Sequence, residues 1–367
     1  MSMTHDEFSQ VHDLIARSLR AGAHAVVATL VSRDGHSYRD VGAMMAMNDA
    51  LELAGGVSGG CLEEYIGRHG RALLRDRASV LMSFDTATEA PDRPRLGCGG
   101  RLEVLVESAR AGHVAYLDAV LSAMSTSDRV ALCCAFNDAG ANDGDRAIVA
   151  DGRAVYGKLP VAAACRMADD VVALREPMLA RTADGQVSIS YLWPRPRLVV
   201  FGAGEDARPL VTIAKAASWH VTVVDRRARL ATPARFPLAD VVMIEPWDLA
   251  IRGLSWNAWT AAVVMTHSVN DDEQILSALL DGPAHESLAA GDGALPQPGY
   301  VGLLGPSVRT DRLWTNLPPS ARSRVCSPVG LALGDKSPAA VAVAIMAELV
   351  AWRRGRTVAA PQAAASF

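Results

Sequence analysis

A glycine turn between a strand-like run and a helix-compatible run constrains this chain most. Gly202-Ala203-Gly204 directly follows the apolar run 197–201, and the next apolar run ends at Asp225, 21 residues after Gly204. Glycines in such a turn let the backbone approach a phosphate, which then lies at a helix N-terminus. The segment predicts a Rossmann-like fold, with Gly202, Gly204 and Asp225 as candidate nucleotide-binding residues. The alternative is that the glycines only allow a tight turn and that Asp225 caps a strand.

Strand-like and helix-compatible segments alternate through the rest of the C-terminal half. The strand-like runs are 197–201, 220–224, 240–244, 262–266 and 300–304, and the helix-compatible ones include 206–217, 272–280 and 338–352. This alternation is typical of a doubly wound parallel sheet. Ligands of such folds bind at the carboxyl edge of the sheet. His267 and Ser307, which follow two of the runs, are therefore further candidates, although a lone histidine is also consistent with a structural hydrogen bond.

The N-terminal half has the pattern of an α+β domain. Residues 6–20 have one apolar helical face, and residues 62–74 can be helical. Short apolar runs, bounded by turns and typical of antiparallel strands, occur at 25–31, 44–47, 102–107, 130–136 and 147–150. The last two partly repeat the earlier pattern, which suggests a degenerate internal repeat of residues 25–110 and 130–190.

Two prolines, Pro194 and Pro196, mark the best domain boundary. We expect an N-terminal α+β domain at 1–193 and a C-terminal Rossmann-like domain at 194–355. The Ala-rich tail, 356–367, is expected to be disordered.

Two cysteines lie in glycine-rich segments of the N-terminal half. The candidate cofactor-binding residues there are Gly59, Gly60, Cys61, Glu63, Cys98, Gly99 and Gly100. Open glycine backbones offer N–H groups to an anion, and a helix start favours a thiolate at Cys61. Because thiolates suit soft metals, Cys61 and Cys98 are candidate metal ligands. The alternative is that both are small buried residues in glycine turns.

Charge and composition narrow the partners. The net charge of −4 gives no field that would gather nucleic acid or an anionic membrane. The charged N-terminus is unlike a signal peptide, and the apolar segment 341–346 is too short to span a bilayer. Six cysteines without a Cys-x-x-Cys spacing indicate neither a zinc site nor a disulfide framework. A cytoplasmic location is expected.

Taken together, these segments resemble the xanthine dehydrogenase accessory factor (XdhC/CoxI) family over nearly the whole chain. The matching strings are Gly55 to Glu63, Gly97 to Glu107, Leu198 to Ala207, Asp225 to Arg227, Thr266-His267, Tyr300 to Gly305 and Pro328 to Leu331. The resemblance implies a homodimer that binds the molybdenum cofactor (molybdopterin). It also implies protection of this cofactor while a cysteine desulfurase sulfurates it, and delivery to a molybdenum hydroxylase apo-enzyme such as xanthine dehydrogenase.

The chain departs from the family's usual pattern at three places. They are Gly35 to Arg39, where the family has Gly-Ser-Ser-Pro-Arg, then Ser268 after Thr-His, and Gly305-Pro306-Ser307. These differences leave the expected fold unaffected.

Two alternative functions remain open at this stage. An NAD(P)-dependent oxidoreductase fits the glycine turn and Asp225, but His267 is its only catalytic candidate. A scaffold for a hydroxylase, without cofactor binding, would make the glycine clusters structural. Gly56 to Gly60 also matches the Gly-x-Ser-x-Gly elbow of hydrolases, but the polar segment before it is unlike the buried strand that an elbow needs. The resemblance therefore favours a cofactor chaperone over an enzyme.

Overall fold

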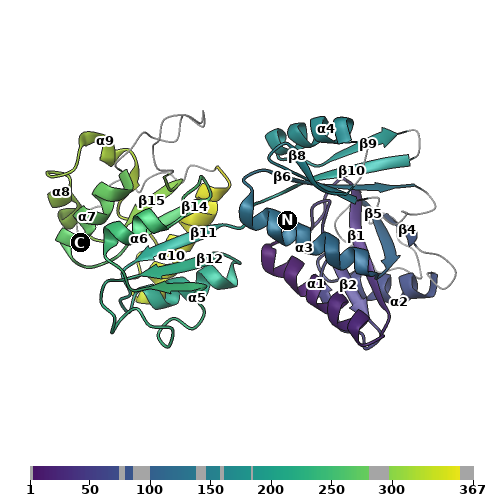
Figure 1. The fold of residues 1–367 in the computed structure, drawn as a ribbon, viewed down its shortest axis with the longest axis horizontal. Helices are drawn as coiled ribbons and strands as arrows, with labels where there is room; N and C mark the ends of the chain where they lie inside the picture. Colours follow the sequence, from purple (N-terminus) through teal and green to yellow (C-terminus); the bar gives the residue numbers. More distant parts are fainter. Residues whose placement is uncertain are drawn as a thin grey trace. The chain divides into compact units, whose positions relative to one another are not determined.

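The chain divides into two compact units, Met1–Pro194 and Arg195–Phe367 (Figure 1). The computed structural model describes residues 3–73, 79–85, 100–137, 146–157, 161–182, 185–280 and 297–355. The tail 356–367, for which disorder is predicted, lies outside these residues.

The N-terminal unit contains two five-stranded antiparallel sheets. The elements of the first half are α1 (His5–Arg20), β1 (Ala25–Asp34), β2 (Met44–Asn48), β3 (Leu53–Gly55), α2 (Glu63–Leu73), β4 (Ser79–Asp85) and β5 (Arg101–Ser108). Those of the second are α3 (Ala111–Thr126), β6 (Val130–Phe136), β7 (Arg146–Ala150), β8 (Arg153–Gly157), α4 (Val161–Leu174), β9 (Met178–Thr182) and β10 (Gly185–Leu192). The predicted antiparallel α+β architecture is confirmed.

The two halves of this unit share one topology. The strand orders are β3-β2-β1-β5-β4 and β8-β7-β6-β10-β9, so each strand has a counterpart at the same place. Gly55 ends β3 and Gly157 ends β8, and both have a positive φ. A Cβ at either glycine would overlap a backbone oxygen of the neighbouring strand, that of Met44 or of Arg146. The same steric requirement therefore recurs in both halves.

Helices α1 and α3 lie side by side (Figure 1); α1 packs on β2 and β3 of the first sheet, and α3 packs on β7 and β8 of the second. Thr4 and Glu7 form a capping box at the start of α1, which satisfies two backbone N–H groups there. Phe8, Val11 and Ile15 are buried in one core with residues of β1 and β2. Helix α1 is thus fixed by its cap and by one apolar face.

A buried ion cluster joins the two halves of the N-terminal unit. The guanidinium of Arg146, on β7, donates to both carboxylate oxygens of Glu107, on β5, and also to the hydroxyl of Thr29 at 3.4 Å. Nε2 of His113, on α3, lies 3.5 Å from Glu107 Oε1. Glu107, His113 and Arg146 are each at most 7 % exposed. The charges of Glu107 and Arg146 are therefore compensated by each other rather than by water.

The buried ion cluster should make the stability of the N-terminal unit sensitive to acid. Burial alone would raise the pKa of Glu107, but the charge of Arg146 and hydrogen bonds from His113 and Arg146 lower that pKa from 4.5 to about 2. A carboxyl group whose pKa is lower in the folded than in the unfolded protein stabilises the fold at pH values above its unfolded-state pKa. This stabilisation is lost as the pH falls through the folded-state pKa. We expect the melting temperature to drop between pH 4.5 and pH 2.

Circular dichroism melting curves across this pH range check the prediction. The matched control is the double variant Glu107→Leu/Arg146→Met, which lacks the carboxylate and should lose less stability over the same range. An equal loss in both proteins would contradict the role of Glu107.

The C-terminal unit is Rossmann-like, as predicted. Its strands, β11 (Arg197–Phe201), β12 (His220–Val224), β13 (Val241–Met243), β14 (Thr260–Val264), β15 (Tyr300–Leu303) and β16 (Val325–Cys326), form a parallel sheet of order β13-β12-β11-β14-β15-β16. Its helices are α5 (Ala207–Ala216), α6 (Trp247–Gly253), α7 (Val269–Leu280), α8 (Ser307–Leu313), α9 (Pro319–Arg322) and α10 (Pro338–Arg353).

Helices cover both faces of this sheet (Figure 1). Leu198 and Val200 of β11 pack in one core with residues of α5 and α10. Val199 and Phe201 point to the opposite face and pack in a second core with residues of α6 and α7. The continuous apolar run of β11 is explained by this burial on both faces.

Within the described ranges, no helix is long and apolar enough to cross a membrane.

Candidate functional site

The glycine–cysteine loop of the N-terminal unit is organised by one buried carboxylate. Glu63 is the first residue of α2 and is 2 % exposed. Its Oε1 accepts from the amides of Val57 at 3.0 Å and Ser58 at 2.7 Å, and its Oε2 accepts from the hydroxyl of Ser58 at 2.6 Å and the amide of Leu62 at 3.2 Å. Glu63 therefore fixes the loop from inside, in the way that a bound anion would.

The tip of this loop is open. Gly59, Gly60 and Cys61 are exposed, and their amides donate to no protein acceptor in the part of the chain that the structure describes. Cys61 lies two residues before α2 begins, and its thiol is 3.7 Å from the hydroxyl of Ser58. Three free N–H groups and a thiol thus face solvent beside a helix start, where the helix dipole favours negative charge.

A second loop, residues 35–40, lies between the glycine segments. A Cβ on Gly59 would lie 3.4 Å from the ring of Tyr38, and a Cβ on Gly100 would lie 2.6 Å from the carbonyl oxygens of Asp34 and His36. The structure therefore places the Cys61 loop and Gly100 at the same end of the first sheet. Cys98 and Gly99, predicted to belong to this site, lie outside the described residues.

Sequence reasoning missed three residues of this site. The ring of Tyr38 is 56 % exposed beside Gly59. Arg39 donates to Glu7 Oε1 at 2.6 Å, which ties the second loop to α1. The buried hydroxyl of Ser58 holds Glu63 and the amide of Leu62, a role unlike that of a hydrolase nucleophile. Ser58 could have been found from its place between glycines. Tyr38 and Arg39 lie in the segment Gly35 to Arg39, which was noted only because it differs from the family's usual sequence.

At the Rossmann edge, Gly202 has a φ of 114°, and a Cβ there would lie 2.6 Å from the carbonyl oxygen of Met265. Glycine is required at this position by the fold itself. Gly204 lies beside the ring of His267, and a Cβ there would make only an ordinary contact of 3.8 Å.

The carboxylate of Asp225 is fully buried and already engaged by protein donors. It accepts from the amide of Ala203 at 2.8 Å, and from the amide, Nε and Nη2 of Arg227 at 2.9, 2.9 and 2.7 Å. Burial raises the pKa of Asp225, but these hydrogen bonds outweigh burial and lower it. No oxygen of Asp225 is left pointing to solvent for a ribose.

Acidic side chains stand where a pyrophosphate would approach α5. Glu205 pairs with Arg208 at 3.1 Å and Arg235 at 2.7 Å, and Asp206 lies 3.3 Å from Nε2 of His267. His267 has a φ of 64° and an exposed ring. The structure thus brings the ring of His267 beside Gly204, and the carboxylate of Asp206, the N-cap residue of α5, lies next to that ring.

A second ion pair, between Asp272 and Arg309, lies beyond the end of the neighbouring strand β14. Asp272, on α7, is buried and accepts from the hydroxyl of Thr266 at 2.5 Å and from Arg309 of α8. Burial raises the pKa of Asp272 despite these partners. Ser307 begins α8, which follows β15. In the described residues, no group of three or more His, Cys, Asp or Glu is placed to hold a metal ion.

Comparisons with known proteins agree with both units. Residues 18–85 match the XdhC and CoxI family, and residues 198–349 match the XdhC Rossmann domain. A curated relative from Bacillus subtilis (strain 168), whose name describes a probable subunit of xanthine dehydrogenase, is 28 % identical over 345 residues. These residues are 94 % of this chain and 97 % of the relative.

A solved structure shares the fold over almost the full length. The crystal structure of a xanthine dehydrogenase from Bacillus halodurans superposes with a TM-score of 0.74 at 24 % identity, and covers 96 % of this chain and 98 % of its own. The two domain matches, in this order on one chain, fit the two units of the structure. This chain belongs to the XdhC and CoxI family.

Proposed function

We propose that this protein is an accessory factor that binds the molybdenum cofactor and delivers it to a hydroxylase such as xanthine dehydrogenase. Family membership and the name of the Bacillus subtilis relative support the link to this enzyme. The observation that carries the proposal is the exposed Cys61 in an open glycine loop. The proposal includes a cysteine desulfurase partner and a homodimer, which follow from the family resemblance, and the cytoplasmic location expected from the composition.

The chemistry of the loop fits this cargo. A pyranopterin carries a phosphate, a flat ring system and a metal bound to sulfur. The free amides of Gly59, Gly60 and Cys61 suit the phosphate. The exposed ring of Tyr38 offers a face for stacking. The thiol of Cys61 suits the metal end, because soft ligands prefer soft metals.

The oxidoreductase alternative has less support from the geometry. NAD is held by a free carboxylate on its ribose, and its pyrophosphate lies at the helix start, where neighbouring negative charge repels it. Asp225 is engaged by Arg227, while Glu205 and Asp206 put negative charge beside α5. The scaffold alternative predicts that the hydroxylase co-purifies without any bound pterin.

Replacing Cys61 by serine is expected to lower the retained cofactor at least about tenfold, the loss that follows removal of a ligating or positioning group. Oxidised-pterin fluorescence and molybdenum content, measured on protein co-expressed with the cofactor pathway, give the result. Cys326→Ser changes another exposed cysteine and should retain wild-type levels. Equal cofactor content in the Cys61 variant and wild type would remove the thiol from the proposal.

A further inference from the structure

The two halves of the N-terminal unit connect one strand to the following helix in different ways. In each half this strand ends in a glycine of positive φ, and it leads from β3 to α2 in the first half and from β8 to α4 in the second. Helix α2 contacts β1 and β5, and α4 contacts the corresponding strands β6 and β10. Seven residues, 56–62, connect β3 to α2, but only three, 158–160, connect β8 to α4. The same arrangement of strand and helix can therefore be connected by three residues.

The additional length of the first connection forms the tip of the Cys61 loop. Val57 and Leu62, near its two ends, are fully buried and pack in the main core. Between them lie the four residues 58–61, as many as the difference in length between the two connections. Gly59, Gly60 and Cys61 are exposed. Most of the additional length thus projects from the core instead of filling space within it.

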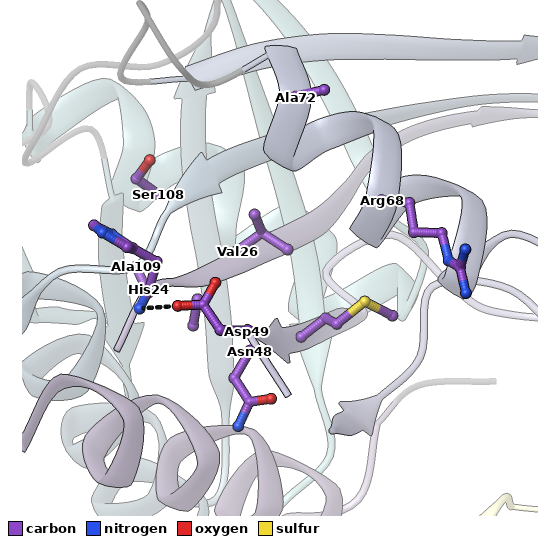
Figure 2. A pocket seen from close by; sticks show the side chains of 10 residues that line it. His24, Val26, Asn48, Asp49, Arg68, Ala72, Ser108 and Ala109 are labelled. Atoms are coloured by element: carbon purple, nitrogen blue, oxygen red, sulfur yellow. Dashed lines mark hydrogen bonds between the residues drawn. The ribbon is translucent and has the colours of Figure 1, made fainter. Parts of the chain in front are cut away.

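Helix α2 is held on the first sheet by contacts outside this loop. Gly67 and Gly70 let the helix lie close to the sheet, because a Cβ at either glycine would overlap a side chain of β2 or β5. Figure 2 shows the helix, marked by Arg68 and Ala72, beside the strand that carries Val26. Loss of the loop tip should therefore leave α2 in place.

The carboxylate of Glu63 serves only the loop in the part of the chain that the structure describes. Every hydrogen bond to it comes from residues 57, 58 or 62, and no cation pairs with it there. A Cβ on Gly56 would lie 3.1 Å from Glu63 Oε1, so a glycine at this position leaves room for the carboxylate. Burying a carboxylate without a cation is costly. The first residue of α4 is the apolar Val161, so a helix start at this place in the fold needs no acid.

We propose that residues 58–61 are an insertion dedicated to the cofactor, and that Glu63 is its positioning residue. The carboxylate takes the amides of Val57, Ser58 and Leu62, which leaves those of residues 59–61 free for the cargo. This inference rests on the proposed function and names the part of the chain that serves it. Because only the first half carries the insertion, each chain binds one cofactor at most.

Glu63→Gln tests the positioning role on the full chain. The side chain keeps its size, but its amide nitrogen cannot accept from Leu62. We expect the pterin retained per folded chain to fall at least about tenfold at an unchanged melting temperature. Hydrogen exchange at residues 57, 58 and 62 should become faster, while β1 and β5 exchange as in the wild type. The matched control is Glu64→Gln, at the neighbouring exposed glutamate, which should behave as the wild type in all three measurements.

A deletion variant separates the insertion from the fold. Removing residues 58–61 together with Glu63→Val gives the first half the connection length and the helix start of the second. Because Val57 and Leu62 remain, the melting temperature should stay close to that of the wild type. Retained pterin should be absent. A variant that does not fold, or one that keeps wild-type pterin, would contradict an insertion dedicated to the cofactor.

The outcomes separate this inference from the proposed function. Wild-type pterin content in Glu63→Gln would overturn the positioning role and leave the proposed function intact. A wild-type protein without pterin would refute the proposed function and, with it, this inference. A ratio near two pterins per chain would reveal a second site and contradict the assignment to the first half alone.

Discussion

Replacing Arg146 by methionine is expected to lower the free energy of unfolding of the N-terminal unit by about 3 to 5 kcal/mol. The change leaves the carboxylate of Glu107 buried without its cation, and it removes the hydrogen bond to Thr29. His113 is the only other charged or chargeable partner of Glu107 in the described residues, and its Nε2 is 3.5 Å away. Its contribution is too small to replace a bidentate guanidinium.

Hydrogen exchange measured by mass spectrometry on the full chain shows which segments lose stability. Peptides of β5 and β7 should exchange much faster in the variant, whereas peptides of β11 to β14 should be unchanged. The double variant Glu107→Leu/Arg146→Met removes both charges and should recover most of the stability, since apolar replacement of a buried pair is often neutral. Slow exchange in Arg146→Met would mean that the cluster is not a structural tie between the two halves.

The C-terminal fold was predictable because local signals and tertiary structure agree there. Runs such as 197–201 are apolar throughout, since β11 is buried on both faces. The predicted run 262–266 is β14 at 260–264, because Met265 and Thr266 already belong to the turn in which Thr266 bonds to Asp272. Apolar character continues past the last paired residue, so it does not mark a strand end.

Much of the N-terminal unit carried no clear periodic signal. Helix α3 was not predicted, because it is apolar nearly all round and lacks a polar face. Its buried residues include Tyr116, Leu117 and Val120, which pack in the main core. Strand β8 is exposed along most of its length and has no alternation to reveal it. Only pairing with β7 makes it a strand.

The candidate sites, like the fold, were only partly predictable from the sequence. The glycine–cysteine string pointed to Cys61, but the role of Glu63 as an internal anion depends on four donors that meet only in the folded loop. The contact of Tyr38 with Gly59 joins segments that are distant in the chain. Likewise, the spacing that identified Asp225 carried no information on the two hydrogen bonds that the Arg227 side chain makes to it.

Replacing Gly202 by alanine is expected to destabilise the C-terminal unit by about 3 kcal/mol or more. The backbone at Gly202 has a φ of 114°, and the new Cβ would meet the backbone of Met265 and Thr266 at 2.6 to 3.1 Å. Backbone atoms at a strand end cannot move aside as a flexible side chain can. Urea unfolding followed by tryptophan fluorescence reports this unit, because Trp193 is the only one of the seven tryptophans outside it.

Gly204→Ala separates the requirement of the fold from that of a ligand. Its Cβ would meet only the ring of His267, at 3.8 Å, so the unfolding midpoint should stay close to that of the wild type. A dinucleotide, in contrast, needs a bare backbone at this glycine to bring its phosphates close. Titration with NADH should therefore give no binding to either protein if Glu205, Asp206 and the engaged Asp225 close this edge. Binding to the wild type that Gly204→Ala abolishes would instead favour the oxidoreductase, because stability would be excluded as the cause.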